Sequence, residues 1–464
     1  MAEDVRLEPR DGRVVVRYRL PIPYFAFVWR PLVARRARAV AAALEAGRPP
    51  PDDVPWWAPP APQAERATVA VACLALLSAV WSYAGGTGGL LTETLPYAAH
   101  AYHVGNRGLG AGLAIVRVGV LLAVALGLAA DRVGRRRFVV AAAIVHCLLG
   151  AAIGLAPTFA AYVGAHLVLR CVDTTLAVAI GVLAVEWVPA ANRALMLSLV
   201  LVAGGIGTGL AVLALPLAAA GRGGFAAAYA LQLLGLPLVL HAARRLPESP
   251  RFLRHAGEPH AYRELLRPPY RRRLVVVGAS SLLSAAFFAP SVEFFTRYLH
   301  DVHRFSSLHI VAFLAVTAAP GAAGVVAGGR LADRFGRKVV GAPLGAASAL
   351  AAAGFFVAGG PWLWLLSLTA ALLGAASGAA LSPYGSELFP TRVRSGANTL
   401  LVLVTVCGSA IGLGTAGVLA GPLGIGHAIA ILAVGPLAGA ALVWLAFPET
   451  ARRELEDTAG EAPA

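Results

Sequence analysis

Ionisable side chains interrupt an apolar stretch near residue 170, and they are the residues best able to carry chemistry. His166, Arg170 and Asp173 follow one another at i, i+4 and i+7, so a helix would place all three on one face. Ionisable groups at membrane depth are costly and usually mark a substrate or ion pathway. The pattern predicts that Arg170 binds an anionic group or clamps Asp173, and that Asp173 carries a proton. A structural pair that locks this helix to a neighbour is the alternative.

Arg117 and Glu293 could extend the same chemistry from other apolar runs. Arg117 lies within the run at 108–130 and could be a second cation for Asp173. Glu293 follows Pro290, which should kink its helix near one end. This acid therefore lies either in a cavity or at the level of the lipid headgroups.

Two further ionisable residues receive plainer interpretations. His146 stands among apolar residues in the run at 138–156, which is more typical of a satisfied helix contact than of a ligand. Glu93 ends the first apolar run, at a depth where a solvated carboxylate costs little.

The chain that must position these residues is very apolar. Of its 464 residues, 58% are hydrophobic and 14% are charged, against about a quarter charged in soluble proteins. Twelve apolar runs are each long enough to cross a bilayer, which takes about 20 residues. They fall near 68–91, 108–130, 138–156, 159–185, 195–218, 224–243, 274–297, 308–329, 340–358, 361–384, 396–419 and 425–446. The predicted fold class is an all-α polytopic membrane protein with twelve transmembrane helices in two groups of six.

Charge and cysteine content argue against several other classes. A net charge of +15 could suit nucleic acid, but the basic residues lie between apolar runs and not along one polar face. We therefore expect contacts with membrane lipids and none with nucleic acid. The four cysteines all lie inside apolar runs without a CxxC motif, so neither a disulfide framework nor a metal site is expected. The sequence shows no nucleotide-binding or hydrolase motif, so we expect no cofactor and no enzyme activity.

The distribution of basic residues predicts an orientation and a domain layout. Most of the 39 Lys and Arg residues lie on one side of the twelve spans, and the positive-inside rule makes that side of the cell membrane, with both termini, cytoplasmic. The expected units are an N-terminal extension with a basic amphipathic helix and a Pro-rich linker (1–66), a six-helix bundle (67–244), a cytoplasmic loop (245–273), a second six-helix bundle (274–447) and a cytoplasmic tail (448–464). The extension is expected to lie on anionic headgroups.

Three short motifs recur along the chain at nearly one offset. The paired motifs begin at Asp131 and Asp333 (DRVGRRR and DRFGRKV), at Glu186 and Glu387 (EWVPAANR and ELFPTRVR), and at Pro247 and Pro448 (PESP and PETA). The members of each pair are 201 or 202 positions apart. Three pairs at one offset indicate a duplicated six-helix unit, and so two pseudo-symmetric bundles.

These motifs resemble the signature elements of the major facilitator superfamily, in particular those of its sugar-porter and organic-ion or metabolite-porter branches. The resemblance covers residues 67 to about 450 and implies transport by alternating access. It also implies that the repeated acids and arginines form a cytoplasmic gate of charge-assisted pairs, with simple anchoring to headgroups as the alternative. The expected gate residues are Asp131, Arg132, Arg135, Glu186, Arg193, Asp333, Arg334, Arg337, Glu387 and Arg394.

The resemblance also gives the ionisable spans a place. It makes the fourth and seventh spans line a central cavity, in which Phe287 and Phe288 would supply apolar walls. Sugar porters carry a glutamine pair in the seventh span, whereas this chain has serines there. A polyhydroxylated sugar needs many hydrogen-bond partners, so the sequence disfavours hexose transport.

We therefore expect a monomeric secondary transporter that moves a small organic anion or metabolite together with a proton. A sugar transporter and a drug or multisubstrate transporter are the alternatives within this class. A transporter-like membrane sensor or receptor is the alternative from another class, although a static receptor would not need two sets of gate residues. The substrate, the direction of transport and the mode of coupling stay open.

Overall fold

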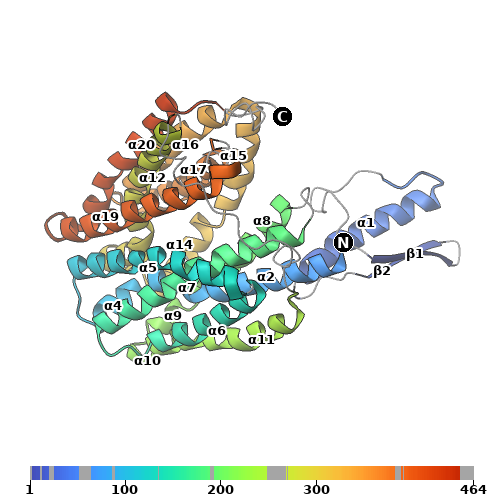
Figure 1. Ribbon diagram of the computed structural model, residues 1–464, viewed down its shortest axis with the longest axis horizontal. Helices are drawn as coiled ribbons and strands as arrows, with labels where there is room; N and C mark the ends of the chain where they lie inside the picture. The colour runs from blue at the N-terminus through green and yellow to red at the C-terminus, as the bar shows by residue number, and fades with distance from the viewer. Residues whose placement is uncertain are drawn as a thin grey trace.

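The computed structural model consists of two helical bundles and a small N-terminal appendage (Figure 1). It describes residues 3–10, 13–19, 24, 26–51, 64–85, 89–133, 135–188, 193–247, 268, 270–381, 388–389 and 391–449. Among these residues, eleven segments are long and apolar enough to cross a membrane. The last, Leu400–Ala446, is 47 residues long and holds two crossings, because its helix breaks at Gly424 with a φ of 78°. The expected twelve spans in two bundles are confirmed.

The N-terminal bundle contains the first six crossings. The first crossing continues from a long helix into two short ones, and the sixth is divided by a 3-10 turn. Its elements are α2 (Glu65–Ala84), α3 (Leu90–Glu93), α4 (Leu95–Ala101), α5 (Asn106–Val133), α6 (Arg135–Ile153), α7 (Phe159–Trp187), α8 (Arg193–Leu213), α9 (Leu215–Ala218), α10 (Arg222–Ala230), η2 (Leu231–Leu234) and α11 (Gly235–Arg245).

The C-terminal bundle contains the other six crossings. Pro290 lies inside its first helix, as the sequence led us to expect, and the helix ends three residues later at Glu293. The chain then continues through one short helix and one π-turn. The elements are α12 (Tyr270–Glu293), α13 (Phe295–Arg297), η4 (Tyr298–Val302), α14 (Ser307–Thr317), α15 (Gly321–Phe335), α16 (Arg337–Phe355), α17 (Pro361–Leu381), α19 (Thr391–Leu432) and α20 (Val434–Ala446).

The two bundles meet at one end of the molecule, which we call the convergent end (residues 90–116 and 290–314). Leu109 of α5 packs there in one apolar cluster with Phe313 of α14 and Leu413 of α19. Gly110 and Gly417 allow α5 and α19 to approach closely, since a Cβ on Gly110 would lie 2.7 Å from the Cα of Gly417. Small residues permit such close helix contacts in membranes.

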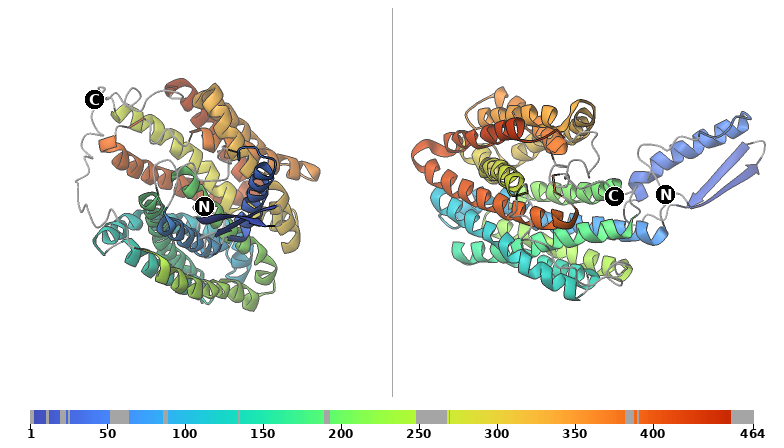
Figure 2. Two further views of the ribbon diagram at one scale, coloured as in Figure 1. Left: turned by 90° about the vertical axis from the view of Figure 1, so that its right-hand side faces the viewer. Right: turned by 45° about the horizontal axis from the view of Figure 1, so that its top comes forward.

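The bundles diverge toward the opposite end, which we call the termini end because both ends of the chain lie there (Figures 1 and 2). The long helices of the two bundles cross near α5 and α19 and spread apart from that crossing, so that the molecule has the outline of a V. The two bundles are therefore in close contact at the convergent end and apart at the termini end.

The N-terminal appendage contains an antiparallel hairpin, which the all-α expectation missed. Strands β1 (Glu3–Arg10) and β2 (Arg13–Arg19) pair with Leu7 opposite Val16. Helix α1 (Ala26–Glu45) follows, within the region expected to hold a basic amphipathic helix. Hairpin and helix project beyond the termini end instead of lying flat against it (Figure 2). Periodicity alone could not separate a short alternating strand from a loop in this basic, Pro-containing segment.

Candidate functional site

A buried polar junction joins the two bundles at the convergent end. Glu293 of α12 lies 2.6 Å from the guanidinium of Arg117 on α5. The other carboxylate oxygen of Glu293 accepts a 2.6 Å hydrogen bond from the hydroxyl of Thr92. Glu93 in turn accepts a 2.7 Å hydrogen bond from Thr296. Each bundle therefore places one acid against a hydroxyl of the other bundle.

The junction corrects two sequence expectations and decides a third. Arg117 is not a second cation for Asp173, because its guanidinium reaches across to Glu293. Glu93 is not solvated: it is only 6% exposed, since α3 packs against α13 of the other bundle. Glu293, for which two places were open, is buried inside the protein and not at the level of the headgroups.

A repeat in the sequence marks this junction, and it escaped the motif comparison. The pattern Glu-x6-His-x2-His occurs as Glu93, His100 and His103, and again 200 positions later as Glu293, His300 and His303. This offset of 200 positions differs by at most two from the 201 or 202 positions that separate the members of the other three motif pairs. Equivalent segments of a duplicated unit meet across the pseudo-twofold axis, so this repeat could have indicated the contact between the bundles.

A second site lies inside the N-terminal bundle, between α6 and α7. Nε2 of His146 lies 2.6 Å from Oδ1 of Asp173, and both residues are buried. The two groups thus form a buried acid–base contact inside the bundle. Gly85 packs directly against the carboxylate and leaves no room there for a Cβ. His146 does make a helix contact, as expected. The partner is the carboxylate of Asp173 on α7, which the sequence did not predict.

Gln232 fixes the proton arrangement of this pair. Its amide nitrogen donates to the backbone carbonyl of Val80 at 3.0 Å and lies 3.3 Å from Nδ1 of His146. Because a carbonyl can only accept, the nitrogen of the amide must face it, and the second amide proton then points to Nδ1. The same amide nitrogen also lies 3.7 Å from the sulfur of Cys147. An amide group that faces Nδ1 favours the tautomer of His146 with its proton at Nε2.

His166 belongs to a separate tyrosine network, although it shares a helical face with Asp173. Its Nε2 lies 3.2 Å from the hydroxyl of Tyr229, which also lies 3.0 Å from the hydroxyl of Tyr162. Thr94, near the junction, lies 3.2 Å from the same Tyr229 hydroxyl. This network connects the interior of the N-terminal bundle to the convergent end.

Arg170 is the most accessible of the three ionisable residues on this face of α7. His166 and Asp173 are buried, whereas Arg170 is half-buried. Its Cβ packs against Gly119 of α5, where an added Cβ would lie 3.1 Å from it, so Arg170 lies next to the helix that carries Arg117. The structure thus brings the predicted residues Arg170, Asp173 and Arg117 into one neighbourhood.

The two phenylalanines expected to line a cavity face different surroundings. Phe287 is buried in the apolar cluster of the convergent end. Phe288 has a side chain that is 62% exposed. Because the two residues are adjacent on a helix they point to different sides, so they cannot form one wall.

The termini end holds an ion pair and a helix cap from the expected gate. Arg135 at the start of α6 is paired with Glu186 near the end of α7. In the other bundle, Glu449 accepts hydrogen bonds from the backbone nitrogens of Arg337 at 2.8 Å and Lys338 at 3.1 Å. A carboxylate at a helix N-terminus satisfies amide donors that have no partner within the helix. Glu449 belongs to the repeated PETA motif, but its capping role was not predicted.

Most other gate residues have side chains outside the described part of the structure. Arg334 is exposed, and its guanidinium lies over the ring of Phe335, 5.2 Å from the ring centroid. Gly336 joins α15 to α16 with a φ of 111°, a backbone conformation that glycine adopts without steric cost. The gate residues whose side chains are not described are Asp131, Arg132, Arg193, Asp333, Glu387 and Arg394.

The short helical segment after α12, formed by α13 and η4, carries a further charged group outside the membrane spans. Nδ1 of His300 lies 2.7 Å from Asp301, and Nε of Arg297 lies 3.2 Å from the same carboxylate. Burial acts to raise the pKa of Asp301, but the hydrogen bond from His300 and the charge of Arg297 outweigh it, so this pKa is lowered. Asp301 therefore stays ionised at neutral pH.

Comparison with known proteins gives a family and a fold. Residues 72–386 match the family model of the Major Facilitator Superfamily. No curated protein sequence matches the chain. Several solved structures are similar, and all are transporters by their titles.

Three of these structures illustrate the likeness. The inward-open xylose transporter XylE from E. coli gives a TM-score of 0.69 at 18% identity, over 84% of this chain and 98% of that one. An inward-facing bacterial homologue of the human lysosomal transporter Spinster gives 0.65 at 14%, over 82% and 96%. The nucleoside transporter NupG gives 0.67 at 16%, over 80% and 98%. At such identities the likeness shows the fold alone.

Proposed function

The chain belongs to the major facilitator superfamily, and we propose that this transporter couples the movement of a small organic anion to that of a proton. The observation that carries the proposal is the buried pair of His146 and Asp173, 2.6 Å apart, on the helix that also presents Arg170. Ionisable residues inside membrane spans usually belong to a transport pathway.

Arg170 is the proposed anchor for the substrate. The residue is half-buried and lies on the same helix as Asp173. A planar guanidinium suits carboxylates and phosphates, which it can bind through two parallel hydrogen bonds. An organic anion is therefore the substrate class that this side chain favours.

The His146–Asp173 pair is the proposed proton carrier. In the described arrangement Nε2 of His146 faces the carboxylate of Asp173 at 2.6 Å, so a proton gained by either group would change that contact. Substrate binding would help, because an anion held at Arg170 would offset the positive charge beside the carboxylate of Asp173. Anion and proton would then bind together, as symport requires.

Alternating access follows from the two ends of the molecule. We propose that the convergent end faces the outside of the cytoplasmic membrane and the termini end the cytoplasm, as the distribution of arginines favours. The described V-shaped arrangement would then be the inward-facing state. The gate residues at the termini end would pair across the bundles when that end closes and the junction of Glu93 and Glu293 opens.

The seventh span supports an anion more than a sugar. Ser280 donates its hydroxyl to the backbone of Val277 at 2.9 Å, so that hydroxyl is already used within its own helix. The similar structures nevertheless include a xylose and a nucleoside transporter, which keeps sugars and other polar solutes as a second candidate. A sensor that binds without transporting is the candidate from another class.

Uptake into proteoliposomes tests the proposal. A panel of organic anions, pentoses and nucleosides would be presented with and without a pH gradient that is acid outside the proteoliposomes. Arg170→Ala should abolish binding of the anion, whereas Asp173→Asn should keep exchange and lose accumulation driven by the gradient. If Asp173→Asn still concentrates substrate, the pair is not the proton carrier, and Glu293 becomes the next residue to test. Binding without any uptake would favour a sensor.

A further inference from the structure

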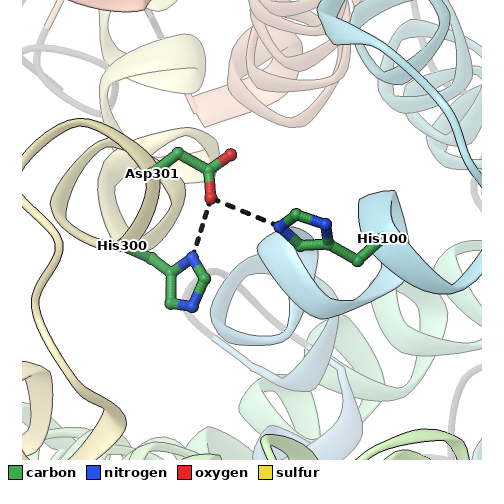
Figure 3. A group of neighbouring side chains, drawn as sticks. All are labelled: His100, His300 and Asp301. Atoms are coloured by element: carbon green, nitrogen blue, oxygen red, sulfur yellow. Dashed lines mark hydrogen bonds and ion pairs between the residues drawn. The ribbon is translucent and has the colours of Figure 1, made fainter.

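Three side chains with metal-ligating atoms gather at the convergent end, apart from the buried sites. His100 comes from α4 of the N-terminal bundle, and His300 and Asp301 come from η4 of the C-terminal bundle. Their ligand atoms all lie within 4.8 Å of one another. Figure 3 shows both imidazole rings directed at one carboxylate oxygen, with His300 below that oxygen and His100 to its right.

The separations between these atoms suit a tetrahedral ion. Oδ1 of Asp301 lies 2.7 Å from Nδ1 of His300 and 3.7 Å from Nε2 of His100. An ion bound at about 2.0–2.1 Å from each tetrahedral ligand holds neighbouring ligand atoms roughly 3.3 Å apart. The two measured distances lie on either side of this value, so small side-chain rotations would complete the site once the proton on Nδ1 of His300 has moved to Nε2 or has been released to solvent.

The surroundings hold the ligands in place and leave a route for an ion. Arg297 contacts Oδ2 of Asp301 at 3.2 Å and so leaves Oδ1 toward the histidines. The ring of Tyr97 packs edge-on against that of His300, with centroids 5.3 Å apart. The side chain of His100 is 71% exposed and that of Asp301 23%. An ion can thus reach the cluster from solvent at the convergent end.

We propose that His100, His300 and Asp301 bind a divalent transition metal such as Zn²⁺, and that the bound ion locks the two bundles together at the convergent end. Two imidazoles and one carboxylate form a ligand set that zinc accepts, with water in the fourth position. Magnesium prefers oxygen ligands in an octahedral arrangement and does not fit this set. The cysteines gave no reason to expect a metal site, but these histidines do.

The duplication explains why the site lies across the bundles. His100 and His300 occupy equivalent places in the Glu-x6-His-x2-His repeat, and their ring centroids are 6.0 Å apart. When the convergent end opens, the two bundles separate and with them the two histidines. The ion therefore binds the described arrangement and loses a ligand in the alternative one.

Zinc binding by the purified full-length protein in detergent is the first test. Cys407→Ser is a suitable background, because Cys407 is an exposed thiol and so a competing ligand. Calorimetry with Zn²⁺ alone should give one ion per chain, and His300→Ala or His100→Ala should weaken the affinity at least ten-fold. His103→Gln, an exposed histidine outside the cluster, should leave it unchanged. Equal affinity in the His300→Ala and parent proteins would overturn the site.

The lock has its own readout, which does not depend on the substrate. Spin labels on Arg107→Cys and Val302→Cys, both exposed positions, report the distance across the convergent end. With free Zn²⁺ at about 100 times its Kd, the ratio of the short-distance to the long-distance population should rise by roughly 100-fold. The His300→Ala protein should show no change. An unchanged ratio in the parent protein despite binding would overturn the lock.

The last test is the inhibition of transport by the ion, and it rests on the proposed transport function. Zn²⁺ added on the side of the convergent end should slow uptake by the parent protein and leave His300→Ala unaffected. Uptake that continues at full rate with the ion bound would contradict the lock. Failure to find any transported solute would count against the proposed function alone, since the binding and distance measurements stand apart from it.

Discussion

The N-terminal bundle buries His146 against Asp173, whereas the C-terminal bundle has Ser348 and Ala375 at the matching positions, 202 residues later. Ser348 donates to the backbone carbonyl of Ala370, at 2.9 Å. The apolar runs at 340–358, 361–384 and 396–419 contain no Asp, Glu, His, Lys or Arg. The duplicated framework is thus shared, but the buried acid–base groups belong to one half.

This difference separates two tasks that a transporter must perform. Closing an end requires contacts from both bundles, and the junction at the convergent end uses an acid from each, Glu93 and Glu293. Binding a substrate and a proton can rest on one bundle while the other moves past it. Symmetry is therefore expected to persist where the bundles meet and to be lost where chemistry is specific.

Removal of the buried histidine should give the largest difference in stability between equivalent positions of the two bundles. His146→Ala takes away the partner of a buried carboxylate, which costs about 3–5 kcal/mol. Ser348→Ala removes one neutral hydrogen bond and should cost about 0.5–1.5 kcal/mol. Thermal unfolding of the two variants in the same detergent measures the difference. Similar losses in both would mean that the His146–Asp173 contact has no special weight in the fold.

The junction offers the opposite expectation, namely equal effects in the two halves. Thr92→Val and Thr296→Val each remove one hydroxyl that donates to an acid of the other bundle. A hydrogen bond to a charged group contributes about 1.5–3 kcal/mol, so each variant should favour opening of the convergent end to a similar degree. The label pair at positions 107 and 302 would report the shift. A large effect from one threonine alone would show that the junction is not symmetric.

Gly85 allows the buried pair to be disturbed without touching either ionisable group. Its Cα faces the carboxylate of Asp173 so closely that an added Cβ must push it aside, and overpacking of this kind costs about 1–3 kcal/mol. Gly85→Ala should therefore uncouple transport from the pH gradient. Gly205→Ala is the matched control, since a Cβ there meets nothing within 4 Å. Normal coupling in Gly85→Ala would argue against Asp173 as the proton carrier.

The twelve spans, the two bundles and the positions of the ionisable residues could all be predicted from the sequence. Runs of about 20 apolar residues have few alternatives to a membrane helix, and the recurring motifs revealed the duplication. The hairpin at Glu3–Arg19 could not, because a short alternating segment next to a basic helix gives no decisive period.

The partners of the ionisable residues were harder to predict than the residues themselves. Arg117 and Glu293 are 176 positions apart, and their contact depends on how the bundles are packed in one conformational state. Local spacing suggested Asp173 as the partner of a cation on its own helix, but helix α6 supplies a histidine from the side. Spacing along one helix says which residues share a face and nothing of what the neighbouring helix presents to it.

The termini end gives the smallest and sharpest test of the shared framework. Glu186 pairs with a side chain, Arg135, whereas Glu449 caps the backbone at the start of α16. Glu449→Gln removes the charge and one of the two acceptor oxygens that receive the amides of Arg337 and Lys338, so it should cost about 1–2 kcal/mol. Glu186→Gln should shift the balance between the inward-facing and outward-facing states by about 1–2 kcal/mol and slow exchange more than it weakens binding. Exchange rates and substrate affinities measured on the same preparations separate the two effects. Lost binding with an unchanged exchange rate in Glu186→Gln would contradict a gating role, because this residue lies far from the proposed anchor and can act on transport only through the closure of its own end.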